Sequence, residues 1–265
     1  MSESQNNYQV SVLLPTLNDA DYIEKCIQSV LKQTYSDFEV IILDGGSTDG
    51  TIEYVNSVSD SRISLVHSKG IVQSLNRGIK EADGEYIARV DADTVSHPKR
   101  FERQVEFLNS NPEVAAVGTA VKRIYPSTRE SWSDRKPTTH REIEKKLIDA
   151  SALVHPAVMM RRSLVEKVGG YRDYRWEDYE LWTRLLQFRL ANIDKELVTV
   201  YQRENSVQGN TSPIQSILSN TVCGLLAITR SSFPVRRKLM LYAILLPKFI
   251  KKISYKYLYQ DEQRG

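Results

Sequence analysis

The first hundred residues alternate between short apolar runs and stretches of helical periodicity, and this alternation limits the fold more than any other feature. An apolar run bounded by turn residues is typical of a buried strand. Such runs occur at residues 10–14, 38–43, 63–67 and 85–90. After each run, apolar residues recur with the spacing of one helix face. Four strand–helix units in succession predict an α/β fold, with a mostly parallel sheet and helices on both faces.

The second half of the chain continues this pattern less regularly. Strands are predicted at residues 114–117 and 157–160, and helices at 98–108 and 176–186. The polar stretch 122–146 is predicted to be an irregular surface loop, with an acceptor-binding insertion as the alternative. The 265 residues, 41% of them hydrophobic, are enough for one large domain with an appendage. We expect a domain over residues 1–212 and a helical, basic extension over 213–265.

Polar residues follow three of the predicted strands, at the point where each strand ends. They are Pro15, Thr16 and Asn18 after the first strand, Asp44 after the second, and Asp91 and Asp93 after the fourth. The carboxyl ends of parallel strands meet at one edge of a sheet, so these residues should line a nucleotide-sized crevice. The sequence contains neither a P-loop motif nor a dinucleotide-binding glycine motif.

Asp91 and Asp93 are candidate metal ligands. They are two positions apart, so both side chains can face the crevice if Ala92 turns away. Two hard oxygen ligands on a rigid backbone suit Mg²⁺ or Mn²⁺ that also carries phosphate oxygens. The alternative is a solvated loop whose carboxylates cap a helix.

Glu177 and Asp178 begin the predicted helix 176–186 and allow two interpretations. Carboxylates are favoured in the first turn of a helix by its dipole, which needs no function. A carboxylate held rigidly beside a crevice can also act as a general base.

Charge is distributed unevenly along the chain. The net charge is +3, but residues 230–265 hold nine Lys/Arg and two Asp/Glu, a balance of +7, and the remainder carries −4. A mildly acidic body does not have the footprint of a nucleic-acid-binding protein, so no nucleic-acid partner is expected. Residues 235–259 combine apolar, basic and tyrosine side chains as interfacial helices do, with a break at Pro247. Packing of this segment on the body, or on a second copy in a homodimer, is the alternative.

The expected location is the cytoplasm, with peripheral contact at the inner face of the cell membrane. The longest clean apolar run, residues 240–246, is too short to span a bilayer. No secretory leader is evident before Tyr8. Cys26 and Cys223 are too isolated to form a disulfide framework or a metal motif, which suits a reducing compartment.

An ordered set of motifs over about residues 8–207 resembles the family 2 inverting glycosyltransferases. The motifs are Pro15-Thr-x-Asn18, Asp44-Gly-Gly-Ser-Thr-Asp-Gly-Thr51, Asn76-Arg-Gly78, Gly84 to Asp93, His97-Pro98, His155-Pro156, Gly169-Gly-Tyr171 and Glu177-Asp178-x-x-Leu-Trp182. The resemblance implies a GT-A fold and a nucleotide-diphosphate sugar donor, with a UDP-sugar expected. It implies a glycan or lipid-linked acceptor, Mn²⁺ or Mg²⁺ as cofactor, and a role in cell-surface polysaccharide or glycolipid assembly.

Roles for single residues also follow from the resemblance. Those implied at the nucleotide are Pro15, Thr16, Asn18, Asp44, Asn76 and Asp91. Asp93 corresponds to the principal metal ligand, with Asp91 beside it, and Asp178 corresponds to the catalytic base. Glu177 and His155 are further candidates, although a histidine before proline at a strand start is more often structural.

The sequence departs from the family pattern in two places that affect these roles. Many relatives have a second aspartate where this chain has Gly45, which leaves Asp44 alone at the base. Many also have a histidine, a metal ligand, within the stretch corresponding to residues 201–206, where this chain has none. Arg203 would then contact the diphosphate, or the metal would be held more weakly. The rival functions are a non-catalytic nucleotide-sugar-binding or scaffolding protein and a sugar nucleotidyltransferase.

Overall fold

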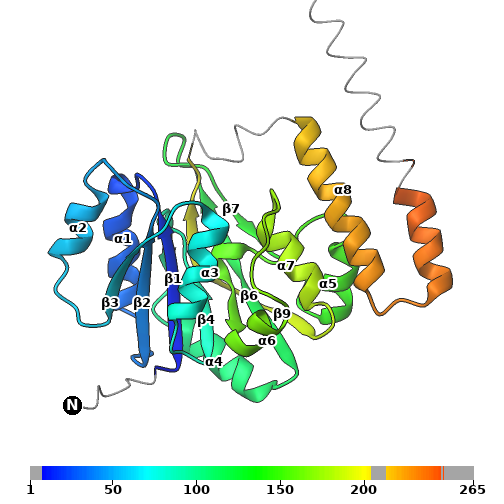
Figure 1. Ribbon diagram of the computed structural model, residues 1–265, viewed down its shortest axis with the longest axis horizontal. Coiled ribbons are helices and arrows are strands. Elements are labelled where there is room, and N and C mark those ends of the chain that lie inside the picture. Colours follow the sequence, from blue (N-terminus) through cyan, green and yellow to red (C-terminus); the bar gives the residue numbers. More distant parts are fainter. Residues whose placement is uncertain (1–7, 204–212, 246, 248–265) are drawn as a thin grey trace, which may run out of the picture.

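A computed structural model describes residues 8–203, 213–245 and 247 (Figure 1). Its strands are β1 (Val10–Thr16), β2 (Phe38–Asp44), β3 (Ile63–His67), β4 (Tyr86–Arg89), β5 (Thr94–Ser96), β6 (Val114–Ile124), β7 (Ser131–Asp134), β8 (Met159–Arg161) and β9 (Arg189–Tyr201). Its helices are α1 (Ala20–Leu31), α2 (Thr51–Ser57), α3 (Ile71–Glu81), α4 (Arg100–Ser110), α5 (His140–Lys146), the short 3₁₀ helix η1 (His155–Ala157), α6 (Arg162–Lys167), α7 (Glu177–Leu185) and α8 (Pro213–Arg230).

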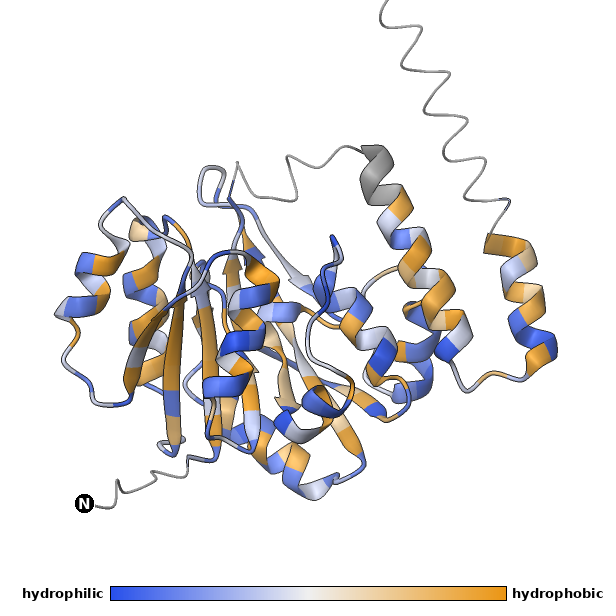
Figure 2. Cartoon of the chain, in the orientation of Figure 1, coloured by the Kyte–Doolittle hydropathy of each residue, from blue (hydrophilic) through white to orange (hydrophobic). Residues whose placement is uncertain are grey.

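The strands form one mixed sheet in the order β3-β2-β1-β4-β8-β6-β9-β5, with β7 paired to β6. The first four strands along this path run parallel. β8 is antiparallel to both of its neighbours, and β5 is antiparallel to β9. The predicted α/β class with a mostly parallel sheet is confirmed. Helices cover both faces: α1, α2 and α4 pack on one apolar cluster, and α3, α5, α6 and α7 pack on the other (Figure 2).

Strand register brings the predicted crevice residues to one edge of the sheet. Thr16 pairs with Asp44 across β1 and β2, and Leu13 pairs with Arg89 across β1 and β4. β5 then pairs with the far end of β9, where the Tyr201 backbone N–H donates to the Asp93 carbonyl oxygen at 2.9 Å. The chain therefore returns to the end of β4 more than a hundred residues later.

A buried polar pair on α4 supports the end of β4. The Arg100 side chain is fully buried and donates to the Arg89 carbonyl oxygen at 2.8 Å. Gln104, one turn later, donates to the Val117 and Ala157 carbonyl oxygens, each at 3.0 Å. A buried carbonyl without a partner is costly, so these side chains stabilise the strands where the antiparallel β8 interrupts the parallel order.

The stretch 122–146 is not the irregular loop predicted from its polarity. Within it, β6 and β7 form an antiparallel pair, and α5 starts at a capping box of Thr139 and Glu142. The capping pattern was present in the sequence, but the hairpin was not evident because the β7 side chains are largely exposed and polar.

The C-terminal segment packs against the body through α8. Arg230 pairs with the buried Glu180 of α7 at 3.2 Å, and the Ser232 hydroxyl donates to Glu144 at 3.0 Å. Gly224 permits close approach of α8 to the body, because a Cβ at that position would lie 2.3 Å from the Ile148 carbonyl oxygen.

Residues 235–245 form a further helix alongside α8 (Figure 1). The rest of the predicted segment 235–259, apart from residue 247, lies outside the described residues. No helix of the described ranges is both long enough and apolar enough to cross a bilayer.

Candidate active site

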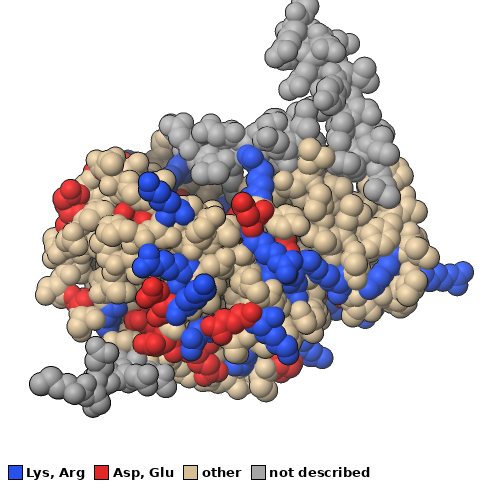
Figure 3. All heavy atoms as spheres, in the orientation of Figure 1, with Lys and Arg blue, Asp and Glu red and all other residues tan. Residues whose placement is uncertain are grey.

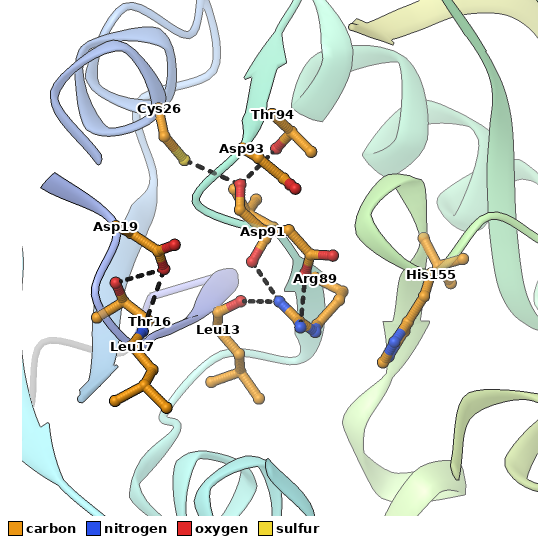
Figure 4. A network of polar contacts seen from close by, with 12 residues as sticks. Leu13, Thr16, Leu17, Asp19, Cys26, Arg89, Asp91, Asp93, Thr94 and His155 are labelled. Carbon is orange, nitrogen blue, oxygen red and sulfur yellow. Dashed lines mark hydrogen bonds and ion pairs between the residues drawn. The ribbon is translucent and has the colours of Figure 1, made fainter. Parts of the chain in front are cut away.

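The turn after β4 carries Asp91 and Asp93, and its backbone is held by hydrogen bonds to one carbonyl group. The Asp91 carbonyl oxygen accepts from the Thr94 hydroxyl at 2.7 Å and from the Cys26 thiol at 3.3 Å (Figure 4). The Thr94 backbone N–H donates to the same oxygen at 3.0 Å. These hydrogen bonds hold the backbone of the turn that carries both aspartates.

Arg89 is a buried cation directly behind this turn. Only 4% of the residue is exposed, and its Nη2 lies 2.6 Å from Asp91 Oδ1. The two groups form an ion pair, but the contact does not have the geometry of a hydrogen bond. Asp91 Oδ1 is therefore a buried oxygen without a hydrogen-bond donor among the described residues. Arg89 lies within the motif Gly84 to Asp93 but was assigned no role from the sequence, because an arginine inside an apolar strand does not by itself indicate a partner.

Arg203 bridges two carboxylates at the front of the turn. Its Nη1 lies 2.5 Å from Asp19 Oδ1, and its Nε donates to Asp93 Oδ2 at 3.1 Å. Asp19 also accepts from the Thr16 hydroxyl at 2.8 Å. The sequence indicated no site role for Asp19, and the structure places it beside Asp93 through their shared contact with Arg203. The position of Asp19, directly after the polar residues that follow the first strand, could have indicated this from the sequence.

The carboxylates of Asp19, Asp91 and Asp93 lie close together, and their combined negative charge favours binding of a cation. Burial raises the pKa of Asp93 to about 6, and the negative charges of Asp91 and Asp19 add to this rise while Arg203 opposes it. In the described part of the chain, no three acidic, histidine or cysteine side chains are placed so that they could hold one metal ion by themselves. Two carboxylates are nevertheless sufficient for a Mg²⁺-type ion that keeps substrate phosphates and waters as its other ligands. The residues present therefore fit a divalent cation that binds together with a diphosphate.

The predicted nucleotide residues of β1 and β2 meet at the crevice edge, where they shape the loops. Asn18 has a positive φ of 56°, and its side-chain oxygen accepts from the Thr48 backbone N–H at 2.9 Å. The Asp44 carboxylate accepts from Ser47, Gly46 and His67. Burial acts to raise the pKa of Asp44, but these hydrogen bonds outweigh it and lower the pKa. Pro15 precedes this edge in β1. Contact of these residues with a nucleotide stays a prediction.

Asn76 is engaged in a structural contact. Its amide donates to the Tyr171 carbonyl oxygen and accepts from the Tyr171 backbone N–H, both at 2.8 Å. It thereby attaches the loop before α7 to α3. Its role at the nucleotide also stays a prediction, and the side chain would have to release this loop to fulfil it.

Glu177 and Asp178 start α7 and lie near enough to Asp91 for its charge to add to the effect of burial in raising the pKa of both. Burial raises the pKa of Asp178 to about 6, and the Asp91 charge adds to this rise. Burial and the Asp178 charge raise the pKa of Glu177 to about 7. Burial also raises the pKa of Tyr171, whose hydroxyl senses the charges of both α7 acids and of Asp91. These mutual effects require the start of α7 and the end of β4 to lie close together.

His155 lies behind this group. Its Nε2 shares a 2.8 Å hydrogen bond with the Tyr171 hydroxyl, and its ring meets Trp182 edge to face at 5.8 Å. Burial, aided by the Arg89 charge, holds the pKa of His155 well below its usual value (Figure 4). These contacts place the imidazole where it orients the Tyr171 hydroxyl, and a further role for His155 at the site stays a prediction.

Comparison with known proteins identifies the family. The model of glycosyl transferase family 2 matches residues 11–169. The chain is 32% identical over 250 residues to the putative glycosyltransferase EpsE of Bacillus subtilis, covering 86% of this chain and 84% of that protein. It is 31% identical over 183 residues to the O-antigen biosynthesis glycosyltransferase WbnJ of Escherichia coli, covering 67% of this chain and 71% of that protein.

Solved structures agree on the fold. S. aureus TarS in complex with UDP-GlcNAc superposes with a TM-score of 0.73 at 19% identity, covering 90% of this chain and 71% of that chain. The mannosyltransferase PcManGT from Pyrobaculum calidifontis, in complex with GDP-Man and Mn²⁺, gives a TM-score of 0.64 at 20% identity, covering 96% and 76%. The chain belongs to glycosyl transferase family 2 and has the GT-A fold.

Proposed function

We propose that this glycosyltransferase moves a sugar from a nucleotide-diphosphate donor to an acceptor hydroxyl, with inversion at the anomeric carbon. The observation that carries the proposal is the approach of Asp178 to Asp91, seen in the effect of the Asp91 charge on the Asp178 pKa. Acids from distant parts of the sequence then flank one site, with the donor diphosphate on the β4 side and the acceptor on the α7 side.

Asp178 would act as the general base. An acceptor hydroxyl is a weak nucleophile, so proton removal during attack accelerates transfer by roughly 10²–10⁴. A base pKa of about 6 leaves Asp178 largely ionised at neutral pH while keeping it more basic than an exposed carboxylate. Attack from the α7 side, opposite the leaving diphosphate, inverts the sugar.

Asp93 and Asp91 would hold a divalent cation together with the diphosphate. When bound, the cation supplies Lewis-acid neutralisation of the charge that develops on the leaving group. Arg89, ion-paired with Asp91 at 2.6 Å, fixes that carboxylate behind the site. The chain otherwise contributes positioning, which accounts for much of the rate in reactions of this kind.

For the donor we propose a UDP-sugar, and for the acceptor a growing cell-surface glycan. A structural neighbour was solved with UDP-GlcNAc, and a sequence relative acts in O-antigen biosynthesis. The test is release of UDP or GDP from a panel of nucleotide sugars, with Mn²⁺, Mg²⁺ or EDTA. Metal-dependent turnover of one donor supports the proposal. Tight donor binding without turnover, even with acceptor glycans present, would indicate a non-catalytic binder.

We further propose that residues 1–212 form the catalytic domain and residues 213–265 a separate C-terminal segment. Within that segment, the helix over residues 235–245 contacts an anionic membrane. Four of its apolar side chains are 44–73% exposed, namely Val235, Leu239, Met240 and Ile244. Arg236 is exposed beside them. Uncharged side chains dominate this end of the molecule in Figure 3, with basic groups at its margin. An apolar face with basic neighbours is typical of helices that lie in a lipid interface.

Vesicle sedimentation tests the membrane contact. With vesicles containing anionic lipid, Leu239→Asp combined with Ile244→Asp should markedly reduce the pelleted fraction, because charge opposes burial in the lipid interface. Ile71→Asp, at an exposed apolar residue of α3, is the matched control and should pellet like the wild type. Equal pelleting of the double variant and the wild type would refute the contact.

A further inference from the structure

Arg203 holds a specific place among the carboxylates at the end of β4. Its guanidinium lies between Asp19 Oδ1, at 2.5 Å, and Asp93 Oδ2, at 3.1 Å. It also lies 4.6 Å from the centroid of the Tyr22 ring, in a cation–π contact. A permanently charged group therefore joins the proposed metal ligand Asp93 to a second carboxylate with no assigned role.

The two ends of this bridge are held unequally. The Asp19 side chain is 7% exposed, and its second oxygen accepts from the Thr16 hydroxyl at 2.8 Å and the Leu17 backbone N–H at 3.1 Å. The Asp93 side chain is 22% exposed, and within the described ranges Arg203 is the donor recorded to its carboxylate. The Asp93 end is therefore the end that can exchange its partner.

A divalent cation and Arg203 compete for Asp93. Both require lone pairs of the same carboxylate, and two cations at adjacent positions repel each other. A bound diphosphate removes this competition, because its oxygens can accept hydrogen bonds from the guanidinium N–H groups in place of Asp93. We propose that Arg203 is the resident cation of the donor-free site, and that it transfers from Asp93 to the donor diphosphate when metal and donor bind, while Asp19 retains its other end. This inference rests on the proposed function.

Binding of Mn²⁺ alone and of UDP with Mn²⁺ should respond to Arg203→Gln in opposite directions. Loss of the competing cation should tighten binding of Mn²⁺ alone by about tenfold, the effect of losing one charged hydrogen bond. Loss of the phosphate partner should weaken binding of UDP with saturating Mn²⁺ by a similar factor of about ten. A variant that merely disturbed the fold would weaken both.

Two further variants serve as controls. Arg62 pairs with Asp60 at 2.8 Å and lies 4.4 Å from the Phe38 ring centroid, so it matches Arg203 in kind but lies on another loop. Arg62→Gln should leave both affinities unchanged. Arg203→Lys keeps the charge and loses the donor fork, so it should restore Mn²⁺ affinity to the wild-type value and UDP affinity in part.

The full-length chain is used, with bound Mn²⁺ measured by electron paramagnetic resonance and UDP binding measured by calorimetry. If the wild type binds both ligands and Arg203→Gln binds Mn²⁺ no more tightly, the inference is wrong while the proposed function stands. If the wild type binds neither ligand, the proposed function fails and the inference fails with it. Opposite shifts in Arg203→Gln, absent in Arg62→Gln, establish the exchange.

Discussion

At the scale of single residues, Glu177 and Asp178 show how one helix start can provide two acids with different properties. Both pKa values are raised, first by burial, to about 7 for Glu177 and about 6 for Asp178. The structural interpretation from the helix dipole alone would lower both values. The raised values instead mark a crowded, partly desolvated crevice, as is common at functional sites.

Asp178→Asn should strongly reduce transfer while leaving donor binding intact. The expected loss is roughly 10²–10⁴-fold in turnover, since only the general base is removed. The Asp178 pKa is higher in the folded protein than its ordinary 3.8, so its ionisation at neutral pH opposes folding. The variant should therefore melt at a higher temperature than the wild type. Wild-type turnover would remove Asp178 from the mechanism, and a lower melting temperature would contradict the raised pKa.

The pH profile of transfer should show an acidic limb near the Asp178 pKa of about 6. Below that value the base is protonated, and the rate should fall about tenfold per pH unit. Glu177→Gln should leave the limb near the same pH, because Glu177, with a pKa of about 7, is already mostly protonated and neutral where Asp178 titrates. A limb that disappears in Glu177→Gln would assign the base to Glu177.

Sequence alone predicted the residues that follow strands, but it did not predict the cations that pair with them. Asp91 and Asp93 were identifiable because a buried strand must end where they stand. Arg89 and Asp19 were not, because their roles depend on partners brought together by folding. The Arg203–Asp93 contact joins positions 110 residues apart, and only the pairing of β5 with β9 creates it.

At the scale of elements, the parallel half of the sheet was predictable and the second half was not. β1, β2 and β4 are apolar runs of mostly buried residues, which is the signal of parallel strands, and β3 at the edge of the sheet is only half-buried. β9 was missed because Asp194, Lys195 and Glu196 interrupt its apolar pattern where its pairing with β6 is irregular. The sequence predicted a helical C-terminal extension, but the docking of α8 on α7 through Arg230 and Glu180 required the structure.

Gly224→Ala should test that docking. Its Cβ would lie 2.3 Å from the Ile148 carbonyl oxygen, so α8 must shift away from the body. We expect a loss of about 1–3 kcal/mol in unfolding free energy from overpacking. Replacing a helical glycine by alanine adds about 1 kcal/mol of stability, so the net change should be a loss of up to about 2 kcal/mol. Chemical denaturation measures the change, with Asn220→Ala, at an exposed α8 position, as control. A variant more stable than the wild type would show that α8 does not pack this closely.

At the scale of the whole molecule, the sheet has two ends with different surroundings. The carboxyl ends of the parallel strands carry Asp44, Asp91 and Asp93. At the opposite end, a surface cavity of about 560 Å³ includes Asp37 and Arg162 in its lining. We assign function to the first end because buried, mutually perturbed acids gather there, whereas the cavity at the other end is lined by side chains that are largely solvated.

A crystal structure of the full chain with UDP and Mn²⁺ tests this assignment most directly, because manganese is located by its anomalous signal. We expect one Mn²⁺ bonded to Asp93 and to the diphosphate, with the β-phosphate, which carries the sugar in a donor, facing Asp178. Manganese and UDP in the cavity beside Arg162, or a diphosphate with Asp178 turned away from it, would contradict the account.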